Sequence, residues 1–174
     1  MTGLILRDAR DTDQAAIREI TLAAYQEYAS VGPELWDLYR QDMLRTLADI
    51  GPAEQIVAEL DGALVGTVLL VPADAPAGGP APARVRRPWP EIRLLAVAPA
   101  ARGRGIGAAL VHECMRRVRQ AGQSAITLHT TDMMAVAQAM YLRMGFVPAP
   151  ELDFQPAPGF LVKGYRLQLA PPAD

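Results

Sequence analysis

The stretch from Arg102 to Gly107 reads Arg-Gly-Arg-Gly-Ile-Gly, so glycine stands at every second position beside two arginines. Apolar residues then recur at every fourth position, at Ile106, Leu110, Cys114 and Val118, which predicts a helix that the glycines open. A backbone without side chains can approach an anion, and the first turn of a helix has N–H groups with no intrahelical partner. This stretch is therefore suited to bind a diphosphate.

Two well-known phosphate-binding loops do not fit this spacing. A P-loop requires a Lys-Ser or Lys-Thr pair after the glycines, and none follows here. The dinucleotide-binding fingerprint requires G-x-G-x-x-G directly after a strand, whereas here the third glycine comes one place early and Pro99 to Ala101 intervene. A third type of loop must be considered.

The stretch resembles the R-x-x-G-x-G loop of the GNAT acyltransferase superfamily, as Arg102, Gly105 and Gly107. Further along the chain, Tyr141 to Phe146 repeats the Y-x-x-x-G-F ending of the next helix in that family. The two motifs occur in the family's order within 91–147. The resemblance implies an N-acetyltransferase that moves an acetyl group from acetyl-CoA to a primary amine by direct transfer.

The resemblance also implies where the cofactor binds. In the family, the loop and the first turn of the helix hold the pyrophosphate, and backbone groups at the end of the preceding strand bond the pantetheine. The helix from Met133 to Met144 would lie on the other side of the cofactor. The expected cofactor-binding residues are Leu95, Ala96, Val97, Arg102, Gly103, Arg104, Gly105, Ile106, Gly107 and Ala108.

Amine acetylation requires a base, because a protonated amine is not a nucleophile, and an acid favours departure of the thiolate. By the resemblance, Glu91 at the head of the central strand is the candidate base, acting through a water; a solvated strand-end carboxylate is the alternative. His129, near the end of the next strand, is the substitute base, and water alone stays open. Tyr141 is the candidate acid, and a packed core tyrosine is its alternative.

The acceptor site is the least defined part. In the family, the first two helices and the loop before the last strand shape it; here these are Tyr25, Tyr28, Trp36 and 153–159, with His129 beside them. Tyr25 and Trp36 are equally suited to a core. A peptide amino terminus, a lysine, a polyamine, an aminoglycoside and an arylamine stay open. So do a different acyl-CoA donor and a non-catalytic acyl-CoA-binding module.

Composition favours a single domain over residues 1–174, with 51% hydrophobic and 21% charged residues. One cysteine and two histidines offer no cluster for a metal, so none is expected. Between 84 and 119, nine arginines stand against Glu91 and Glu113, while the whole chain has a net charge of −2. This basic segment lacks interleaved aromatic residues, so we expect no nucleic-acid partner.

No apolar run is long enough to span a membrane, and no signal peptide is evident, so the expected location is cytoplasmic. A homodimer stays open. The segment 72–90 holds six prolines among small residues and is expected to be a mobile loop.

The order of elements predicts an α/β fold, and the resemblance makes it a GNAT-like three-layer α/β/α sandwich with a mixed, centrally splayed sheet. The expected strands are 4–6, 55–60, 63–71, 92–97, 124–130, 146–147 and 161–169, and the expected helices begin at Asp11 or Thr12, at about Glu34, after the glycine loop, and after a cap at Thr131 or Asp132. We expect Tyr28 on the inner stripe of the first helix and Leu38 on that of the second. Asp61-Gly62 predicts a hairpin turn.

Overall fold

The computed structural model of the chain describes residues 3–75 and 88–170, so most of the expected loop 72–90 lies outside the described residues. The chain divides into two compact units: residues 1–70 with 94–114, and residues 71–93 with 115–174. The single-domain expectation stays a prediction.

The strands are β1 (Leu4–Asp8), β2 (Glu54–Leu60), β3 (Ala63–Val71), β4 (Glu91–Val97), β5 (Ala125–Thr130), β6 (Val147–Pro148), β7 (Phe154–Ala157) and β8 (Phe160–Gln168). The helices are α1 (Gln14–Tyr25), α2 (Pro33–Ala48), α3 (Ile106–Gln120) and α4 (Ala135–Arg143), with short 3-10 helices η1 (Asp11–Asp13), η2 (Gln26–Val31), η3 (Pro99–Ala101) and η4 (Pro150–Leu152).

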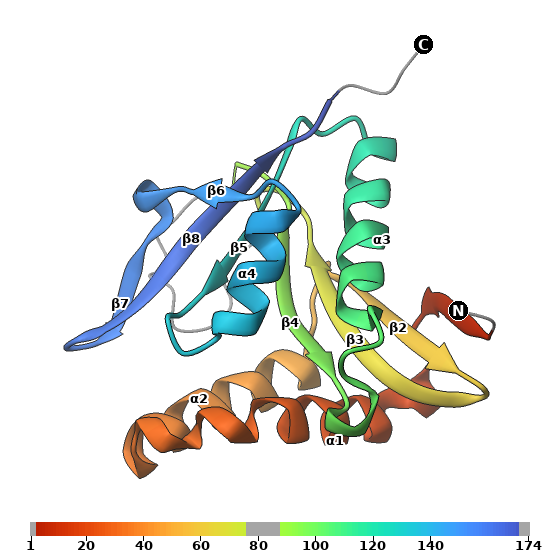
Figure 1. Cartoon of the computed structure of the whole chain (residues 1–174), viewed down its shortest axis with the longest axis horizontal. Coiled ribbons are helices and arrows are strands. Elements are labelled where there is room, and N and C mark those ends of the chain that lie inside the picture. Colours follow the sequence, from red (N-terminus) through yellow and green to blue (C-terminus); the bar gives the residue numbers. More distant parts are fainter. Residues whose placement is uncertain (1–2, 76–87, 171–174) are drawn as a thin grey trace. The chain divides into compact units, whose positions relative to one another are not determined.

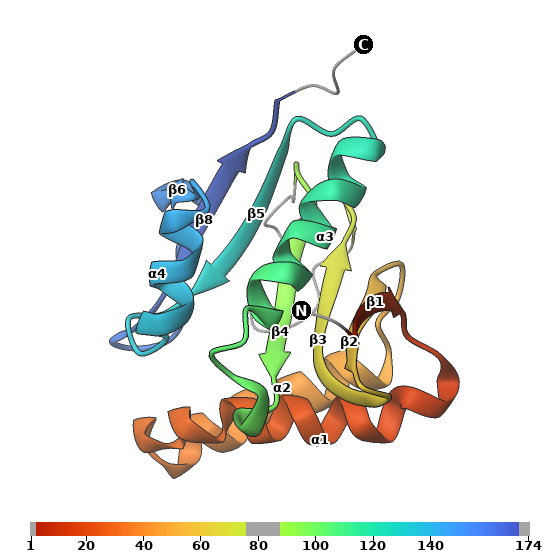
Figure 2. The same ribbon diagram turned by 45° about the vertical axis from the view of Figure 1, so that its right-hand side comes forward.

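The first unit contains an antiparallel sheet in which β1, β2 and β3 are neighbours in that order (Figure 2). Asp61 (φ 51°) and Gly62 (φ 84°) form the two-residue turn between β2 and β3, which confirms the predicted hairpin. Val57 of β2 packs with Ile17 of α1 and Leu47 of α2, all of them buried. Helices α1 and α2 therefore cover one face of this sheet.

The first turns of α3 cover the opposite face of the same strands. Gly66 of β3 pairs with Ala58, the neighbour of Val57, so the two faces alternate along β2. A Cβ at Gly66 would lie 3.1 Å from side-chain atoms of both Ile106 and Leu110. The absence of a side chain at Gly66 thus allows α3 to approach β3 closely.

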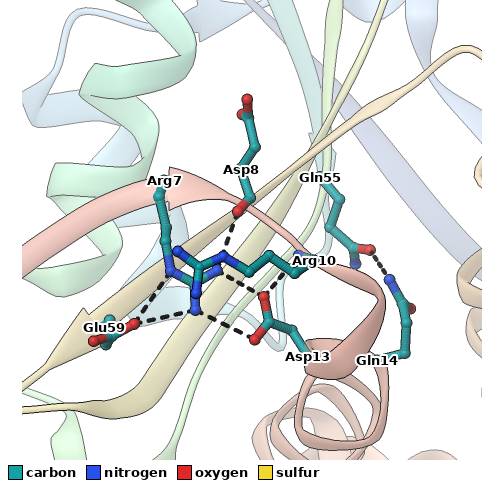
Figure 3. Close-up of polar contacts among 7 residues, drawn as sticks. All are labelled: Arg7, Asp8, Arg10, Asp13, Gln14, Gln55 and Glu59. Carbon is teal, nitrogen blue, oxygen red and sulfur yellow. Dashed lines mark hydrogen bonds and ion pairs between the residues drawn. The ribbon is translucent and has the colours of Figure 1, made fainter.

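A polar cluster fixes the start of α1 against the sheet (Figure 3). The Arg7 guanidinium of β1 donates to Asp13 Oδ2 at 2.7 Å and to Glu59 Oε2 of β2 at 3.1 Å. Asp13 also accepts the backbone N–H of Arg10 at 2.7 Å, and its residue is only 7% exposed. The hydrogen bonds from Arg7 and, to a smaller extent, the hydrogen bond from the Arg10 N–H lower the pKa of the Asp13 carboxyl.

The second unit is built on β5, β8 and β6, which are antiparallel neighbours in that order, with β7 paired to β8. Helix α4 lies beside β8 in both views of the ribbon (Figure 1 and Figure 2), and the Gln138 side chain donates to the Tyr165 hydroxyl at 2.7 Å. Gly145 (φ 92°) ends α4, as predicted, and lets the chain turn into β6.

Strand β4 pairs in parallel with β5 through two residue pairs, Glu91 with Thr127 and Ile92 with Leu128. Among the described residues, the pairing of β4 with β5 ends at Ile92. Leu94 then adopts φ 48°, which costs a non-glycine residue about 1–2 kcal/mol. Within the first unit, the Leu94 side chain packs against the core cluster of α1, α2 and β2. The expected mixed sheet that splays after the start of β4 is confirmed.

Several predicted details of the helices are wrong. Helix α1 begins at Gln14, after η1, and ends at Tyr25; the 3-10 geometry that follows removes Tyr28 from its stripe. The buried stripe of α2 consists of Trp36, Met43 and Leu47, which leaves Leu38 47% exposed.

The end of the chain also differs in two places from the sequence expectation. The Met134 N–H bonds the Thr131 carbonyl in a turn at 3.0 Å, so α4 begins at Ala135 and neither Thr131 nor Asp132 caps it. Segment 153–159, expected to be a loop, contains β7 because Phe154 and Ala157 pair with Val162 and Phe160.

Candidate active site

The glycine loop leads directly into α3, as predicted. Gly103 (φ 73°) and Gly105 (φ 75°) adopt conformations that other residues rarely adopt without strain. The Gly105 carbonyl accepts the Ala109 N–H at 3.0 Å, which is the first hydrogen bond of the helix. The N–H groups of Ile106, Gly107 and Ala108 therefore belong to the first turn, where no intrahelical acceptor exists. Because that turn has no acidic residue, it offers a favourable place for an anion.

The side chains around this loop have different roles. The Ile106 side chain is 1% exposed and packs in the core, so Ile106 can meet a ligand only through its backbone. The Arg102 guanidinium donates to the Ala24 carbonyl at 2.8 Å and pairs with Glu27 at 3.0 Å. Arg102 thus ties the loop to the end of α1, while the exposed Arg104 follows directly in the loop.

The end of β4 is held from the side of α1. The Tyr25 hydroxyl donates to the Leu95 carbonyl at 3.2 Å, and the Ala98 N–H donates to the Val65 carbonyl of β3 at 2.8 Å. Ala96 is 2% exposed, and its carbonyl would lie 3.1 Å from a Cβ at Gly66. The backbone of 95–97 is therefore fixed after the Leu94 bend, in the same unit as the glycine loop.

Aromatic residues of α1, η2 and α2 form a connected cluster. Ring centroids lie 5.9 Å apart for Tyr25 and Tyr28, 5.8 Å for Tyr25 and Tyr39, and 6.5 Å for Trp36 and Tyr39. Tyr25 (8% exposed) and Trp36 (9%) are buried, which fits the packing role weighed for them. Burial raises the pKa of Tyr28 to about 12, with a further contribution from Glu27, so its hydroxyl is protonated at neutral pH.

The two candidate bases lie together in the second unit. Glu91 is 4% exposed, so it is not the solvated strand-end carboxylate of the alternative interpretation. His129 Nδ1 lies 2.8 Å from Glu91 Oε1, and His129 Nε2 lies 2.9 Å from the Leu152 carbonyl oxygen. Glu91 is paired with Thr127, and His129 lies two residues beyond Thr127 on the same face of β5. The parallel register therefore places the imidazole beside the carboxylate.

Tyr141 is buried near the end of α4, in the second unit. It is 6% exposed, and its ring lies edge-on to Phe146 with centroids 5.8 Å apart. The Tyr141 carbonyl accepts the Phe146 N–H at 3.1 Å, which closes the turn at Gly145. The ring is packed as a core tyrosine would be, and the role of its hydroxyl as an acid stays a prediction.

The sequence from residue 15 to 146 matches the profile of the acetyltransferase (GNAT) family. The chain belongs to this family. It is 35% identical over 137 residues to the mycothiol acetyltransferase of Nocardia farcinica, covering 79% of this chain and 38% of that protein. It is also 36% identical over 90 residues to N-acetyltransferase 8B of Rattus norvegicus, covering 52% of this chain and 37% of the relative. The chain thus spans well under half the length of these curated relatives.

Solved GNAT structures share the fold of this chain. A Staphylococcus aureus acetyltransferase of the family superposes with a TM-score of 0.70 at 16% identity, covering 96% of this chain and 99% of the other. A Brucella melitensis family member in complex with acetyl-CoA gives 0.61 at 24% identity, covering 98% and 91%. The ribosomal-protein-S18-alanine N-acetyltransferase of Escherichia coli gives 0.64 at 16% identity, covering 98% and 97%. The predicted fold class is confirmed.

The described residues contain no group of three or more histidines, cysteines or carboxylates that could hold a metal ion. Within the same residues, no helix combines the length and the apolar character that crossing a bilayer requires. The cytoplasmic location and the homodimer stay predictions.

Sequence reasoning missed three features that contact or position the candidate residues within their own units. The Leu152 carbonyl is a backbone group, which no motif marks, and the bend at Leu94 depends on how β4 packs. Tyr39 had a signal, because it follows Trp36 by one helical turn and so shares its face.

Proposed function

We propose that this chain is an acetyl-CoA-dependent N-acetyltransferase that transfers an acetyl group directly to a primary amine. The observation that carries the proposal is the family's glycine loop, which opens α3 with two glycines at positive φ and an anion-favouring first turn. The loop matches the chemistry of a diphosphate, since it offers N–H donors, exposed glycines and a positive charge at Arg104.

Cofactor binding is assigned to residues of the first unit. The backbone of Arg102 to Ala108 would hold the pyrophosphate, with the Arg102 side chain keeping the loop in place through Ala24 and Glu27. The backbone of Leu95 to Val97 would bond the pantetheine amides. The hydrogen bond from Tyr25 to the Leu95 carbonyl and the burial of Ala96 support this, because they fix the backbone that would do the bonding.

The chemistry is assigned to residues of the second unit. Glu91, bonded to His129, takes the proton that the amine loses as its nitrogen bonds the acetyl carbon. The C–S bond then breaks, and the Tyr141 hydroxyl gives a proton to the departing thiolate. The contact with His129 supports the role of base, because it places a second proton-binding group 2.8 Å from the Glu91 carboxylate within the same unit.

The acceptor is a primary amine, and its identity is left to experiment. A mycothiol acetyltransferase is among its sequence relatives, and a ribosomal-protein-S18-alanine N-acetyltransferase is among the solved structures that share its fold, so similarity does not single out one acceptor. In the aromatic cluster Tyr25 and Trp36 are buried, whereas Tyr28 and Tyr39 are half-buried and are available as polar contacts.

Thiol release from acetyl-CoA, measured across a panel of peptide, polyamine, aminoglycoside and arylamine acceptors, tests the proposal. Thermal unfolding with acetyl-CoA at a hundred times its dissociation constant should show stabilisation of about 2.7 kcal/mol. Gly105→Glu should lose that stabilisation, because the added carboxylate and bulk occupy the place of the diphosphate. Gly51→Glu is the matched control, since Gly51 is also exposed with positive φ (54°) but follows α2.

Each result has a distinct meaning. Full stabilisation of Gly105→Glu would refute the assignment of the loop. Stabilisation of the parent without thiol release from any amine would leave a non-catalytic acyl-CoA-binding module. Faster release from succinyl- or propionyl-CoA than from acetyl-CoA would change the donor while the site assignment held.

A further inference from the structure

Gly164 of β8 is a position where η4 packs closely on the second unit's sheet. A Cβ at Gly164 would lie 2.4 Å from the Leu152 Cβ and 3.0 Å from the Ala149 carbonyl oxygen, distances that real side chains do not tolerate without movement. Hydrogen bonds fix the same approach, since the Ala149 N–H donates to the Gly164 carbonyl at 2.8 Å and the Gly164 N–H to Asp153 Oδ1 at 2.7 Å. Glycine is therefore required here for close packing.

This close packing brings the Leu152 carbonyl to His129. Gly164 is the register partner of His129 across the β5–β8 pair, so removing the side chain at 164 opens space next to the imidazole. The Leu152 Cβ and carbonyl carbon lie in that space, 2.4 and 3.2 Å from the place of a Cβ at Gly164, and the Leu152 carbonyl oxygen lies 2.9 Å from His129 Nε2. A carbonyl only accepts hydrogen bonds, so this contact requires a proton on Nε2.

The other imidazole nitrogen faces a second acceptor. His129 Nδ1 lies 2.8 Å from Glu91 Oε1. With the proton fixed on Nε2, a neutral His129 would present the Nδ1 lone pair to the Glu91 carboxylate, and the two would repel. One additional proton, on Nδ1 or on Glu91, satisfies both contacts. The geometry thus favours the pair after it has accepted a proton.

We propose that Gly164 is a positioning residue that makes Glu91 and His129 a single proton acceptor. By allowing the Leu152 carbonyl to hold Nε2–H, it keeps Nδ1 free to share the proton that the pair removes from the amine. The role in catalysis rests on the proposed acetyltransferase function. The proton is accounted for at each step: the amine loses it, the contact between Glu91 Oε1 and His129 Nδ1 holds it, and it returns to water after the product leaves.

Other charged groups on the elements packed around this pair must be considered for its pH dependence. They are Arg93 on β4, Asp132 after β5, Glu151 and Asp153 at η4, and Lys163 and Arg166 on β8. Glu151 and Arg166 pair at 2.6 Å, as do Asp132 and Lys163. Asp153 accepts the Gly164 N–H, so Gly164→Ala also disturbs that carboxylate. The NMR measurement described below separates the two effects, because it reports the proton on His129 Nε2 directly.

Nitrogen-15 NMR of the imidazoles tests the inference without any turnover. The chain has two histidines, and the exposed His112 serves as an internal reference. In the parent, His129 should carry the proton on Nε2 at every pH, while its Nδ1 signal changes as the pair titrates. In Gly164→Ala, the displaced Leu152 carbonyl should release Nε2, so that His129 moves toward the Nδ1–H form. A parent His129 protonated on Nδ1 alone at high pH would overturn the inference.

Activity variants then test the positioning role. Gly164→Ala should lower kcat/KM about tenfold, less than the ~10²–10⁴-fold expected when a general base is removed. The acidic limb of the pH–rate profile of this variant should move to lower pH. The reason is that the Nδ1–H form of His129 relieves the repulsion with Glu91, which makes the Glu91–His129 pair a weaker base. Adding Leu152→Gly removes the atom 2.4 Å from the new Cβ and should restore most of the parent profile. Leu161→Ala, at an exposed site on β8, should change neither the NMR nor the pH profile.

The outcomes are separable. A Gly164→Ala variant that loses the Nε2 proton but keeps the parent pH–rate profile would show that the contact is structural and refute the positioning role. The same profile shift in Leu161→Ala would also refute it, because any change on β8 would then suffice. Absence of turnover in the parent would refute the proposed function, while the NMR result would still decide the protonation of His129.

Discussion

Substitution of Asp13 is expected to destabilise the protein more than substitution of any other acid at the start of α1. Asp13→Ala removes the hydrogen bonds from the Arg7 guanidinium at 2.7 and 3.2 Å and from the Arg10 N–H at 2.7 Å (Figure 3). Asp13→Asn keeps an oxygen for the Arg10 N–H but removes the charge that pairs with Arg7. The two variants therefore separate the charge from the cap.

The expected size follows from burial. The side chains of Asp13 and Arg7 are 9% and 19% exposed, so Asp13 removal leaves a poorly solvated guanidinium. Breaking a buried pair costs about 3–5 kcal/mol, and Arg7 retains Glu59 and the Asp8 carbonyl, which reduces the loss. We expect about 3 kcal/mol for Asp13→Ala and about half of that for Asp13→Asn. For a chain of this size, 3 kcal/mol lowers Tm by about 6–12 °C.

The pH dependence has a definite sign. Arg7 holds the pKa of the folded Asp13 carboxyl below its ordinary value of 3.8. A carboxyl whose folded pKa lies below its unfolded pKa contributes stability that is complete above the unfolded value and is lost as the pH falls through the folded one. The gap between the parent and Asp13→Asn should therefore be constant from about pH 5 to 8 and shrink below about pH 4.

Urea unfolding of the parent and both variants at pH 7 and pH 3 measures these differences. Asp11→Ala is the matched control, because Asp11 lies in the same turn but is exposed, and it should cost less than about 0.5 kcal/mol. Equal destabilisation by Asp11→Ala and Asp13→Ala would refute the reasoning. So would a gap between the parent and Asp13→Asn that stays the same at pH 3.

Two further predictions concern the proposed chemistry. Glu91→Gln should lower turnover by ~10²-fold or more at neutral pH, with a smaller deficit at high pH where free amine is abundant, and acetyl-CoA should stabilise it as it does the parent. An unchanged pH–rate profile would transfer the role of base from Glu91 to His129 or water. Tyr141→Phe should bind acetyl-CoA nearly as well as the parent, because the ring that packs against Phe146 is kept, while turnover falls ~10–10³-fold. Parent-like turnover of this variant, with an amine that the parent acetylates, would leave Tyr141 as a packing residue.

Local features of the site were predictable because they depend on short stretches of chain. The glycine loop and the helix after it follow from glycine's access to positive φ and from the four-residue apolar repeat, and α3 begins at Ile106 as that pattern requires. The Asp61-Gly62 turn and the end of α4 at Gly145 have the same origin. Each of these features depends on the conformational preferences of a few neighbouring residues.

Where local signals compete, the sequence misled us. Thr131 and Asp132 are good helix caps by type, but a turn closed at Met134 delays α4 to Ala135. Similarly, leucine spacing in α2 pointed to Leu38, whereas the packed residues are Trp36, Met43 and Leu47. Which of several possible faces is buried depends on the partner surface, and that surface comes from distant residues.

Contacts between distant segments were decided by tertiary structure alone. Glu91 and His129 meet at 2.8 Å because β4 and β5 pair in parallel with Glu91 opposite Thr127, and a shift by one residue would turn the imidazole to the other face. Arg102 reaches the Ala24 carbonyl in the same way, through the packing of its loop on the end of α1. The sequence specified the chemical groups. Strand register and the close approach at Gly164 decided their hydrogen-bond partners. Hydrogen bonds are sensitive to differences of a few tenths of an ångström, and only the packed backbone sets distances that accurately.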